Sequence, residues 1–140
     1  MELKEVIKKR HSVRKFRSLD ISSDMIWEII ELAKTAPSAG GLRAYEIMVT
    51  PQKVTNQVDA PFYIVICADL EKSAKRYGDR GRNLYAIQDA TIFGAYVQLI
   101  AVDMGLATVW IGAFNEDKVR EALTIDKHLR PIAIIPIGYE

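Results

Sequence analysis

The segment Arg10-His11-Ser12-Val13-Arg14 carries the residue types best suited to binding an anion. If this segment is extended, Arg10, Ser12 and Arg14 share one face, because side chains alternate with a period of two. Two guanidinium groups and a hydroxyl offer donors that match phosphate oxygens, and His11 can add another donor. The same residues would also suit a basic helix exit that meets only water or a nearby glutamate. On spacing alone, both interpretations stay open.

Two other segments could contact a flat ligand. Residues 37–41 read Pro-Ser-Ala-Gly-Gly, a loop whose small side chains leave room and whose backbone N–H groups can donate hydrogen bonds. Residues 108–114 read Thr-Val-Trp-Ile-Gly-Ala-Phe, a strand end that could lay backbone and aromatic surface against a ring system. Each also has an ordinary interpretation, a glycine turn for the first and a core tryptophan, Trp110, for the second.

The composition excludes several classes of protein. The chain has 140 residues, a net charge of +1, 49% apolar residues and 26% charged residues. These values are ordinary for one globular domain and argue against a disordered chain, a collagen-like repeat or a coiled coil. The single cysteine, Cys67, excludes an internal disulfide and a multi-cysteine zinc site. His11 and His128 are too few and too far apart to indicate a histidine-rich metal site.

The charge is unevenly distributed. Residues 1–17 hold seven Lys or Arg against two Glu, and residues 71–83 hold five against two acidic residues, whereas the remainder is acidic. This pattern favours a compact anionic ligand over a long polyanion. A nucleic-acid binder would usually be more basic overall, with aromatics among its basic residues. A general anion- or nucleic-acid-binding module therefore depends on the basic N-terminus alone.

Hydrophobic periodicity and cap residues predict the elements that must position these segments. A first helix should begin near Leu3 and end near Arg10–His11, and residues 14–17 should be extended. A second helix should follow the cap candidates Ser22 and Ser23 and stop before Pro37. Further helices are expected at 72–77, 83–104 and 115–123, with a basic turn at 79–82. Strands are expected at 45–49, 62–68, 107–111 and 131–137, the last with two prolines that fit a strand end or a sheet edge.

Two of these elements are unusually apolar. The unbroken apolar run at 62–68 indicates a strand buried on both faces. The helix at 83–104 has apolar residues all round, which indicates burial on all sides. A chain of this size has difficulty covering such a helix alone, so a second protomer is expected to supply the missing cover, which predicts a homodimer.

The chain shows no linker, repeat, signal peptide or membrane span, so a single domain over 1–140 in a reducing, cytoplasmic compartment is expected. The predicted fold is α+β, with helices flanking a small, mostly antiparallel or mixed sheet and a central buried helix.

Taken together, three segments resemble the nitroreductase family of flavin oxidoreductases. They are residues 10–16 (Arg-His-Ser-Val-Arg-Lys-Phe), residues 36–43 (Ala-Pro-Ser-Ala-Gly-Gly-Leu-Arg) and residues 105–114 (Gly-Leu-Ala-Thr-Val-Trp-Ile-Gly-Ala-Phe), in the order typical of the family. The apolar helix at 83–104 lies where the family has its dimer-core helix. The resemblance implies a homodimer with two FMN molecules at the protomer interface.

The resemblance also implies residue roles. Arg10, His11, Ser12 and Arg14 would hold the FMN phosphate and ribityl chain. The flavin would be contacted from the partner protomer by Pro37, Ser38, Ala39 and Gly40. Trp110, Ile111 and Gly112 would lie along the isoalloxazine ring near its reactive N5 atom.

The chain also departs from the family pattern. It resembles a short member, because residues 51–61 are too few for the helix that usually follows the first core strand. It ends at Gly138-Tyr139-Glu140, where typical members continue into a tail with a basic residue that also binds the FMN phosphate. Arg80 and Arg82 are the candidates to replace that residue.

The expected function is an FMN-dependent oxidoreductase. NADH or NADPH would reduce the flavin and leave, and a small oxidant such as a nitroaromatic or quinone would then take the electrons, in a ping-pong mechanism. No catalytic side chain is required, because flavin N5 carries the chemistry. No G-x-G-x-x-G motif follows a strand, which argues against a Rossmann nicotinamide site. The alternative is a flavin-binding protein without turnover, and neither nucleic acid nor membrane is an expected partner.

Overall fold

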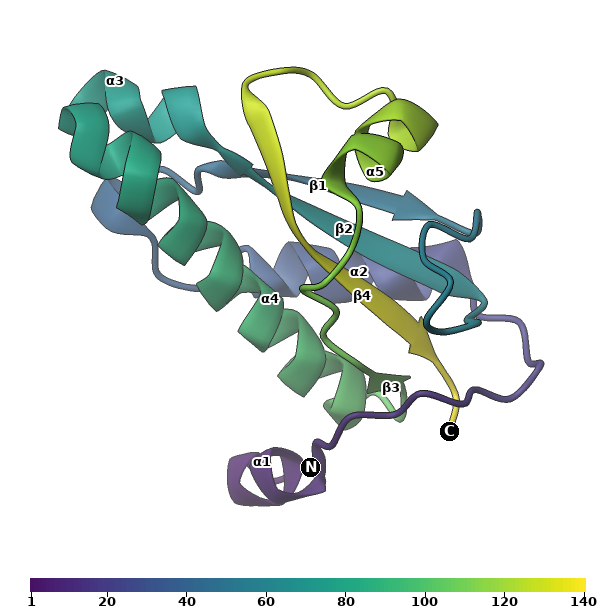
Figure 1. Ribbon diagram of the computed structural model, residues 1–140. Helices are drawn as coiled ribbons and strands as arrows, with labels where there is room; N and C mark the ends of the chain where they lie inside the picture. The colour runs from purple at the N-terminus through teal and green to yellow at the C-terminus, as the bar shows by residue number, and fades with distance from the viewer.

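Four strands form one antiparallel sheet in the order β1-β2-β4-β3 in the computed structural model, which describes residues 1–140 (Figure 1). The strands are β1 (Tyr45–Thr50), β2 (Phe62–Asp69), β3 (Ala107–Thr108) and β4 (Leu129–Gly138). Every strand pair is antiparallel. The predicted α+β class with a small, antiparallel sheet is confirmed.

Five α-helices surround the sheet. They are α1 (Leu3–Lys9), α2 (Ser23–Ala33), α3 (Leu70–Arg80), α4 (Ala86–Asp103) and α5 (Glu116–Leu123). Two predicted caps are present, since the Ser22 hydroxyl accepts a hydrogen bond from the N–H of Asp24 and the Asn115 side chain accepts one from Lys118. Both caps are local signals, which is why the sequence alone locates these two helix starts.

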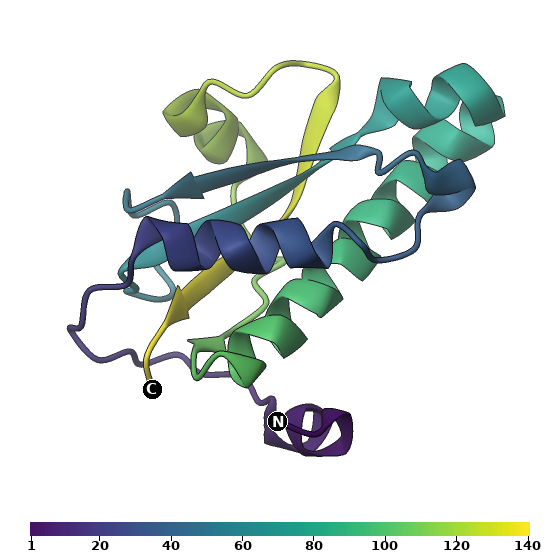
Figure 2. The same ribbon diagram turned by 180° about the vertical axis from the view of Figure 1, so that it is seen from behind.

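The hydrophobic core lies on both faces of the sheet. Ile64 and Ile66 of β2 pack with α2 and α4 in one cluster, and Figure 2 shows α2 crossing this face. Val65 and Cys67 of the same strand pack in a second cluster, which includes Val119 of α5. Successive side chains of a strand point to opposite faces, which explains why β2 is apolar at every position from Phe62 to Ala68. The predicted burial of this strand on both faces is confirmed.

The long apolar helix differs in part from its prediction. It spans Ala86–Asp103 and is joined to α3 by a π-helical turn at Gly81–Tyr85. The basic residues 79–82 continue this helical path, so the turn predicted there is wrong. The chain instead bends at Gly78, with φ 62° and ψ −142°, a conformation open essentially only to glycine. A glycine one residue upstream therefore makes the bend.

One face of α4 stays uncovered in the single chain. Phe93 and Val97 are fully buried, whereas Ile92 and Tyr96 are 36% and 39% exposed. Helix α1 contacts the end of α4 but projects from the body of the molecule in Figures 1 and 2, and its Leu3 is 65% exposed. The chain therefore does not bury α4 on all sides by itself, and apolar side chains on α1 and α4 face solvent.

The position of β4 corrects the interpretation of its two prolines. This strand lies inside the sheet, between β2 and β3, and not at an edge. Pro131 pairs with Cys67 beside a register shift, where regular ladder bonding is interrupted. Ile134 exchanges both backbone hydrogen bonds with Ile111, so two residues later the nitrogen of Pro136 points toward the same neighbour. The neighbouring segment is not paired with β4 opposite Pro136, because β3 ends at Thr108 and the chain pairs with β4 again only at Ile111. No ladder hydrogen bond is therefore lost at the proline nitrogen.

Candidate functional site

The N-terminal segment is extended and lies beside β3. Ser12 forms a parallel bridge with Thr108, and the N–H of Val13 donates to the carbonyl of Thr108 at 3.0 Å. Val13 is buried, so Ser12 and Arg14 on either side of it face outward. The condition set for this segment, an extended backbone, is met at Ser12 and Val13, and it determines which side chains share a face.

Arg14 lines a cavity of about 270 Å³ together with Trp110, Ile111 and Gly112. We refer to it as the Arg14 cavity; its remaining lining residues are Gln57, Val58, Val109 and Ala113. The Gln57 side-chain amide donates to the carbonyl of Ala113, which ties the wall at 51–61 to the segment after Gly112. Two of the three segments singled out in the sequence thus meet within one chain.

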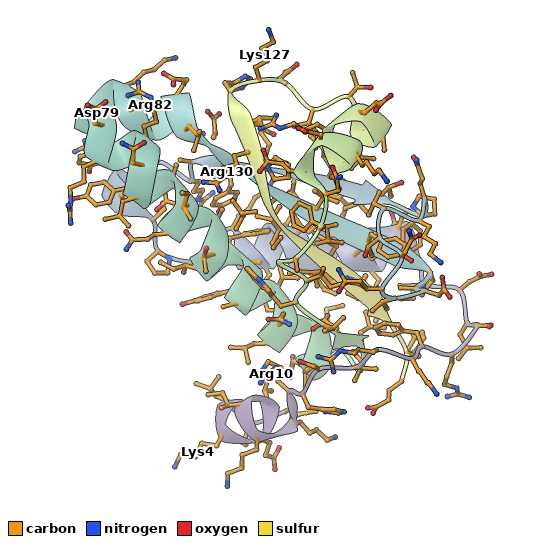
Figure 3. All side chains as sticks on the ribbon, in the orientation of Figure 1. Lys4, Arg10, Asp79, Arg82, Lys127 and Arg130 are labelled. Carbon is orange, nitrogen blue, oxygen red and sulfur yellow. The ribbon has the colours of Figure 1, made fainter.

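Arg14, which lines this cavity, and Arg10, four residues earlier in the chain, are free of acidic partners. No ion pair of the chain includes Arg10 or Arg14. Figure 3 shows Arg10 where α1 meets the extended segment. Guanidinium groups without a carboxylate partner keep their full charge and their donors available for an anionic ligand.

Gly112 and Trp110 have different surroundings. A Cβ atom added to Gly112 would meet only Trp110 Nε1, at 3.8 Å, so the fold of this chain does not require a glycine there. The Trp110 ring packs on Gly94 of α4, where an added Cβ would collide with the ring. Trp110 is half-buried and contacts the core, so it both packs against the core and lines the Arg14 cavity.

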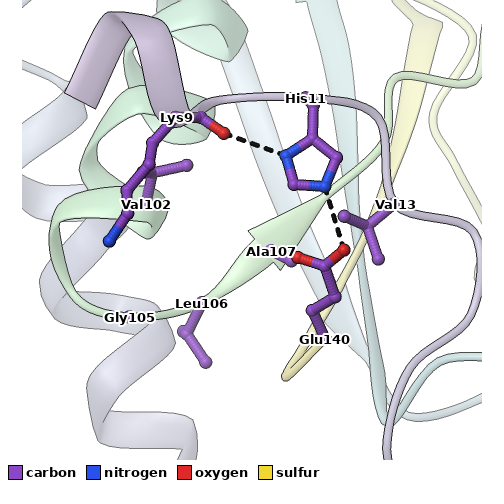
Figure 4. Close-up of a pocket in the computed structure, with 8 residues that line it drawn as sticks. All are labelled: Lys9, His11, Val13, Val102, Gly105, Leu106, Ala107 and Glu140. Atoms are coloured by element: carbon purple, nitrogen blue, oxygen red, sulfur yellow. Dashed lines mark hydrogen bonds and ion pairs between the residues drawn. The ribbon is translucent and has the colours of Figure 1, made fainter. Parts of the chain in front are cut away.

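His11 points into a different cavity, of about 200 Å³, shown in Figure 4. Its Nδ1 lies 2.9 Å from the carbonyl of Lys9 and its Nε2 lies 2.9 Å from a carboxylate oxygen of Glu140. These contacts raise the pKa of His11, the Lys9 carbonyl first and Glu140 second. Both ring nitrogens face acceptors, which suits the doubly protonated imidazolium. The structure does not bring His11 together with Arg14.

The loop at 37–43 is held by a buried carboxylate that the sequence analysis did not single out. Asp89, in the first turn of α4, is 2% exposed. One of its oxygens accepts from the N–H of Ala39 at 2.9 Å and the other from the N–H of Ala44 at 3.3 Å. The signal in the sequence was an acidic residue at the start of an otherwise apolar helix.

The glycines of this loop have conformations that other residues rarely adopt. Gly40 has φ 59°, and a Cβ added to it would lie 2.5 Å from the hydroxyl of Tyr77. The loop lies beside α3, at the opposite end of α4 from α1 in both Figures 1 and 2. None of the residues Pro37, Ser38, Ala39 and Gly40 lines the Arg14 cavity. Within one chain, the third segment therefore stays apart from the other two.

In the second basic stretch, both carboxylates pair with one residue, Arg82. Arg82 pairs with Glu71 at 2.9 Å and Asp79 at 2.7 Å. The hydrogen bond to Arg82 lowers the pKa of Glu71, and the hydrogen bond to Glu71 raises the pKa of Arg82. Arg80 donates to the hydroxyl of Tyr85 at 3.1 Å. Figure 3 places Arg82 at the opposite end of the molecule from Arg10. Neither Arg80 nor Arg82, the candidates to replace the missing basic residue, lines the Arg14 cavity.

One further chemical group, the thiol of Cys67, can be placed. Cys67 is fully buried, and burial raises the pKa of its thiol to about 12, so it stays protonated at neutral pH. No group of His, Cys, Asp or Glu side chains is arranged to hold a metal ion. No helix of the structure has the length and apolarity needed to cross a membrane.

Comparison with known proteins gives consistent results. A model of the nitroreductase family matches residues 7–58 and 53–139. A protein of Methanothermobacter thermautotrophicus, provisionally named NADH dehydrogenase/NAD(P)H nitroreductase, is 30% identical, with 99% of this chain and 78% of the relative covered.

Solved structures agree. A nitroreductase family protein of Clostridium novyi is 33% identical with a TM-score of 0.86, covering 99% of this chain and 85% of that one. An FMN-dependent nitroreductase of Clostridium difficile is 31% identical with a TM-score of 0.81, covering 96% of this chain and 86% of that one. The matched residues include the three segments described above, and the chain therefore belongs to the nitroreductase family, a family of oxidoreductase enzymes.

Proposed function

We propose that this protein uses FMN to pass electrons from NADH or NADPH to a small oxidant, such as a nitroaromatic or a quinone. The observation that carries the proposal is the Arg14 cavity, where an unpaired guanidinium lies beside the open backbone at Gly112. The names of two relatives support it: the M. thermautotrophicus protein is named for NADH and NAD(P)H, and the C. difficile protein for FMN.

The residues around the cavity fit FMN. Arg10 and Arg14, which have no acidic partners, would hold the phosphate, and Ser12 would donate to the phosphate or the ribityl chain. Trp110, Ile111 and Gly112 would lie along the ring, because a residue without a side chain lets a flat group approach the backbone. When bound, FMN supplies the redox chemistry by accepting and releasing a hydride at N5. His11 would reach the phosphate only after leaving its contact with Glu140.

The loop at 37–40 would act from a second protomer. Within one chain it lies apart from the Arg14 cavity, while apolar side chains of α1 and α4 are exposed. Pairing two copies through these faces would bury the exposed apolar surface and complete each cavity with Pro37, Ser38, Ala39 and Gly40 of the other copy. We infer a homodimer with the site shared between its protomers.

Sedimentation velocity tests the dimer. The pair of substitutions Ile92→Glu and Tyr96→Glu changes side chains that are exposed in the single chain, so each protomer should still fold. Two charges on this face should give a folded monomer that no longer retains FMN. Leu19→Glu, an exposed apolar residue on another surface, is the control and should remain dimeric. A wild-type protein that sediments as a monomer with bound FMN would contradict the inference.

The side chains of this protein would bind, orient and exclude water without acting as acid or base. Cys67 is a buried, protonated thiol, and neither histidine lines the Arg14 cavity. The same open face at Gly112 would serve the nicotinamide and the oxidant in turn, which gives ping-pong kinetics. This expectation depends on the open backbone at Gly112 and on the absence of a nicotinamide-binding motif in the sequence.

Anaerobic bleaching of the bound flavin tests the proposed function. The purified protein should be yellow, NADH or NADPH should remove the flavin absorbance, and a quinone added afterwards should restore it. Bound FMN that neither nicotinamide reduces would identify a flavin-binding protein without turnover. A protein that stays colourless in excess FMN would overturn the proposal.

A further inference from the structure

A second cavity, of about 280 Å³, adjoins the Arg14 cavity. Trp110 and Gly112 line both, so a molecule in the second cavity would lie next to one in the first. We refer to it as the Arg130 cavity; its other lining residues are Ile87, Thr91, Phe114, Glu116, Arg130, Pro131 and Ile132. Apart from Trp110 and Gly112, none of the residues that line this cavity has a role in the proposed binding of FMN.

Arg130 is held only by a long ion pair with Glu116, which also lines the Arg130 cavity. The carboxylate of Glu116 is shared by two guanidinium groups: Arg120 donates to it at 3.2 Å, whereas Arg130 lies 3.7 Å away and forms no hydrogen bond with it. Arg120 also donates to the carbonyl of Asp126. Two positive charges against one negative charge leave a net charge of +1, and the donors that remain free belong to Arg130.

The position of Arg130 suits it to meet a ligand. It lies at the start of β4, and Figure 3 shows it between this strand and α4. Its side chain is 52% exposed, compared with 24% for Arg120. Its guanidinium can therefore turn toward a ligand without leaving a buried partner unsatisfied.

The remaining walls favour an aromatic ring. Ile87, Phe114 and Ile132 supply apolar surface, and Trp110 supplies a flat face. The volume of about 280 Å³ lies just below the usual range of about 300–1,000 Å³ for small-molecule sites, which favours a single ring over a fused system. One cation above an apolar, aromatic-lined space is the arrangement that selects a ring with one anionic substituent.

We propose that Arg130 binds the carboxylate of a single-ring aromatic oxidant and directs its ring toward Gly112. This inference rests on the proposed function, because Gly112 is the expected point of electron transfer. Binding itself transfers no electrons. In the turnover that follows with a nitrobenzoate, one NADPH and one proton reduce the nitro group to a nitroso group and release NADP⁺ and one water.

Calorimetric titration with benzoate, which cannot be reduced, tests the binding step. Arg130→Gln should weaken benzoate binding about tenfold, as expected for loss of one charge-assisted contact at a partly exposed site. Glu116→Gln should strengthen binding, because it removes the carboxylate that competes for Arg130. Lys118→Gln, an exposed residue on the same helix, removes the same charge outside the cavity and should leave the affinity unchanged.

Kinetics supply a second readout. With 4-nitrobenzoate, Arg130→Gln should raise KM about tenfold and leave kcat unchanged, whereas with the uncharged methyl ester KM should change less than twofold. Equal effects on both substrates, or wild-type benzoate affinity in Arg130→Gln, would overturn the proposal. Benzoate binding does not depend on reduction, so a protein that binds benzoate through Arg130 but shows no flavin bleaching would contradict the proposed function alone.

Discussion

The loop at 37–43 and the segment at 110–113 both contain glycine, but Gly40 of the loop and Gly112 of the segment have different roles in the fold. In the loop, Gly40 has a positive φ and is crowded by Tyr77, while Asp89 holds the neighbouring backbone. In the segment, Gly112 has open space where a Cβ would lie and no positive φ. The loop thus needs glycine in order to fold, whereas the segment does not.

This difference changes how a small residue is interpreted. A glycine that the fold requires says nothing by itself about a ligand, so the geometry of Gly40 neither supports nor weakens a flavin contact. A glycine that the fold does not require leaves open backbone available to a flat molecule. Gly112 is therefore the better indicator of the site, and the following experiments test that distinction.

The largest effect is expected for Asp89→Ala. Two backbone N–H groups lose their acceptor in a buried position, which should lower the free energy of unfolding by about 3 kcal/mol. Urea denaturation measures the change. Asp103→Ala, at the exposed end of the same helix, should cost less than about 1 kcal/mol. Equal losses for both variants would show that Asp89 does not hold the loop.

Gly40→Ala should destabilise the fold by about 2 kcal/mol, because it combines backbone strain with a collision against Tyr77. Gly41→Ala separates the two causes, since Gly41 has φ 66° but nothing within 4 Å of an added Cβ. That variant should lose only about 1 kcal/mol. Thermal or urea unfolding of the pair gives the difference, and a stability of Gly40→Ala equal to wild type would contradict the description of the loop.

Arg14→Ala should raise the Kd for FMN by about 10- to 100-fold, as expected for the loss of a charge-assisted contact that contributes roughly 1.5–3 kcal/mol. Riboflavin lacks the phosphate and should lose far less affinity. Equilibrium titration of the apoprotein with both flavins measures the ratio. If both lose affinity equally, Arg14 does not bind the phosphate.

Gly112→Val should leave the free energy of unfolding within about 0.5 kcal/mol of wild type, because the space around it is open. FMN binding should nevertheless weaken about tenfold, since the branched side chain would occupy the expected place of the ring. Gly94→Ala gives the opposite pattern, with a stability loss from the collision with Trp110. A Gly112→Val protein that binds and reduces FMN normally would place the ring elsewhere.

The smallest effect concerns His11, on the other side of the extended segment. Its pKa is raised in the folded protein, so its contacts stabilise the fold below about pH 6.5, the ordinary value, and this contribution disappears as pH rises through the folded pKa. Glu140→Gln should lower the pKa of His11 in an NMR titration while FMN affinity stays unchanged. A parallel loss of FMN affinity would show that both sides of the segment serve the ligand.

Local signals explain what could be predicted from the sequence. The caps at Ser22 and Asn115 and the two-sided burial of β2 depend on residues close in the chain, so pattern alone located them. The period of two also separates His11 from Arg14, as the structure places them in different cavities. The phosphate and flavin roles of the site residues remain predictions.

The features that could not be predicted from the sequence depend on contacts between segments that are distant in the chain. The acceptor role of Asp89 exists only once α4 lies against the loop. The prolines of β4 are tolerated inside the sheet only because the neighbouring segment leaves the ladder opposite Pro136. The bend at Gly78 replaces a turn that the charged residues after it suggested, because the choice among nearby positions depends on how α3 packs.

The central place of β4 has a consequence for how this chain folds. The β1–β2 hairpin can form early, but it leaves one edge of β2, apolar from Phe62 to Ala68, open until β4 arrives, after α3, α4 and α5. Pairings between distant segments slow folding, and an apolar strand edge exposed during synthesis can pair with other chains. Newly made protein should therefore aggregate more readily than its native state, and protection of the β2 amides from hydrogen exchange should develop only when β4 has docked.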